Sequence, residues 1–164
     1  MAAGYTLAHD LKTASIHANR ALELDGRSAW AWSRSGWVKA YGGEPQDAIE
    51  RFQIARAMAP ADPQNFLCSI GIAVAHFEAA RYDEAIRWYE HALAEHPTAI
   101  WCNRSLAPAY ALAGRKEQAR QSVLKLTSMY PDLTIAQVRS GLPLSPGFLD
   151  RAAQGLESAG LRAQ

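Results

Sequence analysis

Apolar residues recur with a helical period along most of the chain. In the segment 81–97, Ala85, Tyr89, Ala92 and Leu93 fall at i, i+4, i+7 and i+8, which is one stripe of an amphipathic helix. Pro97 ends this helix, because proline has no N–H to donate and disfavours helix in the residue before it. The segments 45–60 and 116–131 show the same pattern and the same closing proline.

The three segments are evenly spaced. Ala48 and Ala85 are 37 residues apart, and Ala85 and Ala119 are 34 residues apart. The closing prolines repeat the same two steps. An internal period of this size is typical of an array of helical repeats.

Cap and turn residues predict the remaining helices. Ser28 and Thr98 are expected to cap helices, and Asp62 is expected to cap one whose first residue is Pro63. Helices are therefore predicted over 11–24, 28–41, 45–58, 62–79, 81–96, 98–113 and 115–130, with a short helix over 134–140 and a last one over 148–159. Short turns make neighbouring helices antiparallel, and stacked pairs must share a core.

The overall charge is consistent with the prediction of a helical-repeat protein. The chain has 164 residues and a formal charge of +1, from 17 basic and 16 acidic residues. This balance argues against a nucleic-acid surface, which needs clustered basic charge. No apolar run approaches the roughly 20 residues of a membrane span, and the first residues lack the layout of a signal peptide. We therefore expect a cytoplasmic protein with no membrane partner.

Residues at corresponding places in three segments follow one family pattern. They are Trp32, Gly36, Ala48, Phe52, Ala55 and Pro60 in 29–62; Ala73, Tyr82, Ala85, Tyr89, Ala92 and Pro97 in 66–99; and Leu106, Ala107, Tyr110, Gly114, Ala119 and Pro131 in 100–133. This pattern resembles the tetratricopeptide repeat (TPR). The small residues Gly36, Ala73 and Ala107 are expected where the first helix of each pair touches the second.

The resemblance implies an all-α fold, a right-handed α-solenoid of antiparallel helix pairs. It implies three full repeats, a partial repeat over 11–26 and a capping tail over 134–164, within a single domain over 1–164. The stretches 130–139 and 145–156 also resemble the end of the C-terminal TPR region of bacterial class III adenylate and guanylate cyclases. That second resemblance implies a regulatory part of a bacterial signalling protein, without cyclase activity.

The resemblance also implies where a partner binds. In stacked TPRs the first helix of each pair lines a concave groove, with side chains at i, i+3, i+7 and i+10. Those positions hold Trp30, Ser33, Trp37 and Ala40; Leu67, Ile70, Val74 and Phe77; and Trp101, Arg104, Pro108 and Ala111. From this set we predict that Trp30, Trp37, Leu67, Ile70, Val74, Phe77, Trp101 and Arg104 bind an apolar peptide or helix of a protein partner. Core packing of Trp30, Trp37 and Trp101 remains the alternative.

Several alternatives stay open at this stage. The lysines and asparagines with which chaperone-binding TPRs clamp a terminal carboxylate are replaced by Ser33, Trp37 and Ile70, so that role is not expected. The tail either caps the array or lies in the groove, and a homodimer or larger scaffold built through the end helices is a second function. RNA binding by a helical repeat is a third function, which the sequence favours less.

The sequence shows no set of catalytic residues. No nucleophile, base and orienting group can be named, and no zinc spacing or phosphate loop is present, so we expect neither an enzyme nor a cofactor. Cys68 and Cys102 hold the same place in successive repeats and are expected to be free, buried thiols. Pro108 lies inside a predicted helix, where it either produces a kink that widens the groove or is tolerated without function.

Overall fold

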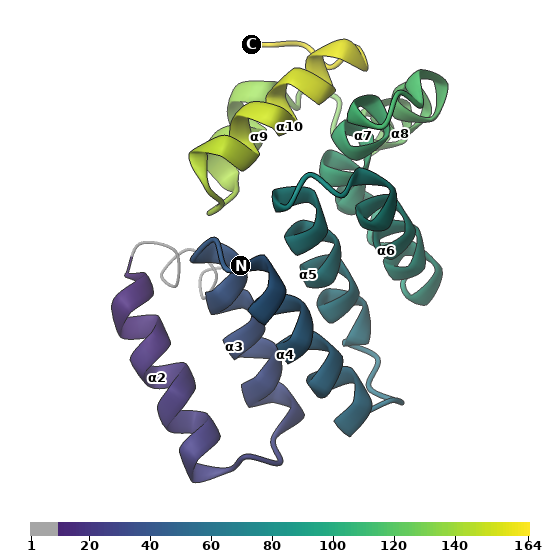
Figure 1. The fold of residues 1–164 in the computed structure, drawn as a ribbon. Helices are drawn as coiled ribbons and strands as arrows, with labels where there is room; N and C mark the ends of the chain where they lie inside the picture. Colours follow the sequence, from purple (N-terminus) through teal and green to yellow (C-terminus); the bar gives the residue numbers. More distant parts are fainter. Residues whose placement is uncertain (1–9) are drawn as a thin grey trace.

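The computed structural model describes residues 10–164, and every regular element in that range is helical (Figure 1). Its α-helices are α2 (Leu11–Leu24), α3 (Ala29–Tyr41), α4 (Pro45–Met58), α5 (Asn65–Glu78), α6 (Tyr82–Glu95), α7 (Asn103–Leu112), α8 (Lys116–Met129), α9 (Ile135–Gly141) and α10 (Pro146–Ser158). One short 3-10 turn, η1 (Ile100–Cys102), precedes α7. The expectation that the first residues do not form a signal peptide concerns residues that lie outside the described range.

The helices pack as consecutive antiparallel hairpins, α3 with α4, α5 with α6 and α7 with α8, and α2 packs against α3. Each hairpin corresponds to one predicted repeat. The predicted class, an all-α solenoid of the TPR type, is confirmed. The tail, residues 134–164, adds α9 and α10 at the far end of the array (Figure 1).

The turn inside each hairpin has the same backbone geometry. Gly43, Ala80 and Gly114 follow the first helix of their pairs and adopt φ of 74°, 56° and 78°. In all three turns the next N–H donates to a carbonyl five residues back, at 3.0, 2.9 and 2.8 Å. This is the left-handed helix end that favours glycine, and only the second repeat makes it with an alanine.

Phe52 fixes the spacing between the first two repeats. Its ring is fully buried and lies between Gly36 of α3 and Gly71 of α5. A Cβ atom at Gly36 would lie 2.8 Å from the ring, and one at Gly71 would lie 2.3 Å from it. The predicted small-residue contact at Gly36 is therefore present, and Gly71 makes the equivalent contact across the repeat junction.

Two predicted helix starts are wrong. The carboxylate of Asp62 accepts the N–H of Gln64 at 2.8 Å in a turn, and α5 begins only at Asn65. Thr98 does not cap a helix; its hydroxyl contacts the His96 ring at 3.1 Å, and η1 separates it from α7. In both cases a short turn after the proline-containing loop takes the place of the expected first helical turn.

Hydrogen bonds from side chains of the tail cap the starts of both of its helices. Thr134 and Gln137 form a reciprocal capping box at the start of α9, and the Ser145 hydroxyl accepts the N–H of Phe148 at 3.0 Å at the start of α10. The last helix therefore begins at Pro146, slightly earlier than predicted. The N–H of Ile135 donates to the carbonyl of Arg162 at 3.0 Å, which returns the chain end to the start of α9.

Candidate functional site

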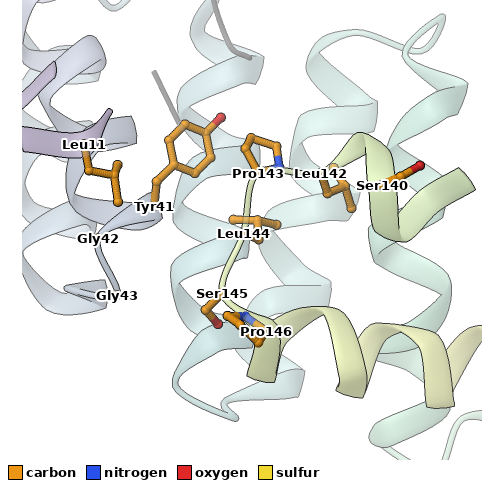
Figure 2. A pocket seen from close by; sticks show the side chains of 10 residues that line it. All are labelled: Leu11, Tyr41, Gly42, Gly43, Ser140, Leu142, Pro143, Leu144, Ser145 and Pro146. Atoms are coloured by element: carbon orange, nitrogen blue, oxygen red, sulfur yellow. The ribbon is translucent and has the colours of Figure 1, made fainter. Parts of the chain in front are cut away.

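A hollow of about 400 Å³ opens where the tail faces the first helix pair (Figure 2). We call it the concave hollow; it is lined by Leu11, Tyr41, Gly42, Gly43, Ser140, Leu142, Pro143, Leu144, Ser145 and Pro146. Figure 2 shows Leu11 and Tyr41 on one side and the α9–α10 linker on the other. The lining combines apolar side chains with a few polar groups, which is typical of a binding site.

Tyr41 is held in the concave hollow by the end of α3. Its ring packs on Trp37, one helical turn earlier, with ring centroids 5.5 Å apart, and Trp37 in turn meets the edge of Phe52 at 5.3 Å. Burial raises the pKa of Tyr41, and the nearby guanidinium groups of Arg34 and Arg104 partly oppose this rise.

The three tryptophans of the predicted groove lie in different surroundings. Trp30 is 67% exposed, with the Arg34 guanidinium 5.8 Å from its ring. Trp37 and Trp101 are half-buried and pack against the hydrophobic core. Both therefore keep part of a ring accessible, while Trp30 is an exposed side chain at the N-terminal end of the array.

The predicted residues of α5 are mostly covered. Leu67 is half-buried, whereas Ile70, Val74 and Phe77 belong to the buried core. Phe77 is fully buried, and the centroid of its ring lies 4.4 Å from that of Phe148 of α10. The structure thus places these three side chains in the core, so the open part of the predicted groove is smaller than the sequence indicated.

Helix α10 covers part of the predicted groove. It packs mainly along α7, and a Cβ atom at Gly155 would lie 2.6 Å from Cα of Pro108, which is buried inside α7. At its start, Ser145 donates to a carboxylate oxygen of Glu78 at 2.7 Å. Arg151 donates to the carbonyl and the carboxylate of Glu78, each at 3.1 Å. The tail therefore caps α7 and also occupies the part of the groove beside the end of α5.

Arg104 is the charged residue of the predicted set. Its guanidinium carbon lies 5.1 Å from the centroid of the Trp101 ring. Its Nε atom is buried, and no acceptor for it is present among residues 10–164. Burial lowers the pKa of Arg104, because the charged form is taken out of water. A guanidinium held in this way has unused hydrogen-bond donors.

Groups capable of metal or thiol chemistry are not assembled into a site. Cys68 and Cys102 are both free and buried, as predicted. Burial raises the pKa of Cys102 to about 12, so its thiol is unreactive at neutral pH. Within the described part of the chain, no group of three or more histidine, cysteine, aspartate or glutamate side chains is placed to hold a metal ion.

These features define a class of protein, an array of TPR-type helix hairpins with a partly covered concave face. The comparisons agree, since residues 76–140 match the family described as Tetratricopeptide repeat. The family match supports a protein–protein interaction module and indicates no catalytic family.

Among solved structures, two crystal structures of MamA are similar to this chain. One is 20% identical, with 92% of this chain and 87% of that chain covered and a TM-score of 0.66. The other is 20% identical, with 95% and 85% covered and a TM-score of 0.65. At this identity the likeness shows the fold. Comparison with curated proteins gives no match.

A separate finding concerns membranes. Among the helices of residues 10–164, none combines the length and the apolar character that crossing a bilayer requires.

Sequence reasoning missed Tyr41, and it considered the tail only as a cap or as an occupant of the groove. The predicted stripe placed Ala40 in the groove, but Ala40 is buried against the second helix of its pair, and its neighbour Tyr41 lines the concave hollow instead. Ser33 likewise faces α5, where its hydroxyl accepts the Cys68 thiol at 3.4 Å. A stripe shifted by one residue at the helix end would have included Tyr41.

Proposed function

We propose that this chain binds an apolar segment of a partner protein at its concave face. The observation that carries the proposal is the half-buried aromatic pair Trp37 and Tyr41, whose ring centroids lie 5.5 Å apart and of which Tyr41 lines the concave hollow. Aromatic side chains with one accessible face are the residues that most often anchor protein interfaces. A volume of about 400 Å³ suits large apolar side chains of a docked segment.

The tail limits the kind of segment that fits. Because α10 covers Phe77 and packs along α7, the free surface lies between the first repeat and the α9–α10 linker. An extended peptide or one face of a short helix fits this space better than a helix laid along the whole array. This supports recognition of a short motif.

The wider context is proposed from sequence alone. The likeness of 130–139 and 145–156 to the end of the TPR region of class III cyclases supports a regulatory role in a bacterial signalling protein. In such a role, the chain would bring a partner segment to a catalytic or DNA-binding domain.

A second function is supported by a specific observation at the N-terminal end. Ile16, Leu24 and Trp30 are 59%, 71% and 67% exposed on α2 and α3. Exposed apolar side chains at an open repeat end favour stacking of a second copy. Sedimentation velocity of wild type and of Leu24→Asp/Trp30→Asp tests this. A dimer in wild type that dissociates in the variant supports it, and a wild-type monomer at high concentration excludes it.

A displayed library of random peptides tests the main proposal. Peptides selected by wild type are synthesised and titrated against wild type and Tyr41→Ala. The matched control is Leu124→Ala, since Leu124 is 68% exposed on α8 and is not among the residues that line the concave hollow. We expect Tyr41→Ala to weaken binding at least about tenfold, as for an interface anchor, and the control to leave it unchanged. Peptides that bind Tyr41→Ala as tightly as wild type would exclude the concave hollow as the site.

A further inference from the structure

A second hollow, of about 550 Å³, opens between α6 and α8. We call it the α6–α8 hollow. Both helices pack against α7, and the lining residues come from α6, from the loop and 3-10 turn that follow it, and from α7 and α8. Its apolar part consists of Leu93, Pro97, Ile100 and Leu106, and none of its lining residues also lines the concave hollow. The volume lies within the range of ligand sites.

Two hydrogen-bond donors on the α8 side of this hollow lack partners. Ser122 is 5% exposed and lines the hollow, yet its hydroxyl makes no hydrogen bond within residues 10–164. By contrast, the buried hydroxyl of Ser69 donates to Glu95 at 2.6 Å and accepts from Arg56 at 2.6 Å. Lys125 follows Ser122 by three residues, so it lies on the same side of the helix, and it forms no ion pair with any described residue. A hydroxyl and an ammonium group placed together are complementary to a carboxylate.

The α6 and α7 sides of the hollow provide acceptors instead. The Tyr110 hydroxyl donates to one carboxylate oxygen of Glu90, and in the described part of the chain nothing donates to the other oxygen. Burial and this bond raise the pKa of Tyr110, so the phenol keeps its proton and remains the donor. Asn103 is 3% exposed and donates its amide to the carbonyl of Ile100 at 2.9 Å, which leaves its Oδ1 atom free to accept.

We propose that the α6–α8 hollow binds a short extended peptide segment of a protein partner, in which an aspartate or glutamate lies beside an aliphatic residue. The acid pairs with Lys125 and Ser122, and the aliphatic side chain contacts Leu93 and Ile100. Main-chain N–H groups of the segment supply the donors that Asn103 and its neighbours lack. A peptide is favoured over a small carboxylic acid because it brings all three kinds of group together. The proposal does not depend on the concave hollow.

The first test needs no ligand. A hydroxyl without a partner contributes nothing to the fold, and alanine is the better helix former, so Ser122→Ala is expected to unfold at the same or a higher urea concentration than wild type. The matched control is Ser69→Ala, which removes a buried hydroxyl that does have partners and is expected to lower the midpoint. A lower midpoint for Ser122→Ala would show that the fold itself uses this hydroxyl and would overturn the proposal.

The second test uses a displayed library of random peptides, selected on wild type and depleted on Lys125→Glu. We expect the remaining peptides to carry an Asp or Glu beside an aliphatic residue, and Lys125→Glu to weaken their binding at least about tenfold. The matched control is Arg120→Glu, which makes the same change of charge on α8 at a side chain that is 63% exposed and outside the hollow. It is expected to leave binding unchanged. If no peptide survives the depletion, or if both variants weaken binding equally, the proposal is overturned.

Exchange of charge provides the sharpest check. Changing the acid of a selected peptide to Lys should abolish binding to wild type and restore binding to Lys125→Glu, an exchange that a merely structural role of Lys125 would not produce. Failure of this restoration would overturn the pairing. Peptides of this site should bind Tyr41→Ala as tightly as wild type, whereas peptides of the concave hollow should not. The two sites can therefore be excluded separately.

Discussion

Replacing Gly155 by alanine tests whether α10 is seated on α7 as described. The added Cβ atom would lie 2.6 Å from Cα and 2.7 Å from Cβ of Pro108. Ordinary carbon contacts are about 3.5–4.0 Å, so α10 must withdraw by roughly 1 Å. Pro108 is buried inside a helix and has little freedom to move away. Overpacking of this kind costs about 1–3 kcal/mol.

The higher helix propensity of alanine stabilises the variant and so opposes the clash. A control variant is needed to subtract this gain. Alanine is a better helix former than glycine by about 1 kcal/mol, which would hide part of the clash. Gly147 provides the control because it lies in the same helix, and its Cβ atom would make only ordinary contacts, with the flexible end of Arg151 at 3.5 Å and the Ser145 hydroxyl at 4.0 Å. The difference between Gly155→Ala and Gly147→Ala therefore reports the clash.

The assay is urea unfolding followed by far-UV circular dichroism. Gly155→Ala is expected to be less stable than Gly147→Ala by about 1–3 kcal/mol, which for a chain of this length lowers Tm by roughly 2–12 °C. Limited proteolysis in the linker 142–145 should also become faster, because Phe148 and Leu156 leave their buried positions. Equal stability of the two variants would show that α10 does not rest on Pro108.

Three further variants test the packing of the core, the turn of the second repeat and the titration of one histidine. Gly71→Ala should destabilise by about 3 kcal/mol or more, because its Cβ atom would lie 2.3 Å from the Phe52 ring; adding Phe52→Leu should recover part of the loss in urea unfolding. Ala80→Gly should raise the unfolding free energy by up to about 1 kcal/mol, because it relieves the left-handed φ of 56°; no change in Tm would contradict this. Burial lowers the pKa of His76 below its ordinary value of 6.5. Its contribution to stability is therefore present above pH 6.5 and lost as the pH falls below it. Between pH 7.5 and 5, wild type should lose more stability than His76→Gln, and parallel losses would exclude His76 as the cause.

Local periodicity predicted most of the helices, because each pair carries its own apolar stripe and its own stop signal. The helix over 45–58 was predicted with the bounds that α4 shows. Thr98 failed as a cap because a cap contributes only about 1 kcal/mol, and the following residues are drawn into the core instead. Ala99 and Cys102 are both about 1% exposed.

The candidate site was only partly predictable, for a physical reason. Helix α5 is apolar on nearly every face, with Ile70, Ile72, Ala73 and Val74 all buried. A helix without a polar side gives no indication of which face remains open. Phe148 of α10 covers α5 at Phe77, but it lies far from α5 in the sequence, so no local sequence pattern predicts that contact.

The bond from Arg151 to the carbonyl of Glu78 joins residues that are 73 positions apart. In an ordinary stack of repeats each unit touches only its neighbours, so the array can fray from either end. Here the last helix is fastened to the middle of the stack. Melting the C-terminal end must therefore disturb the second repeat at the same time, and the chain should unfold from the tail to the middle in one concerted step.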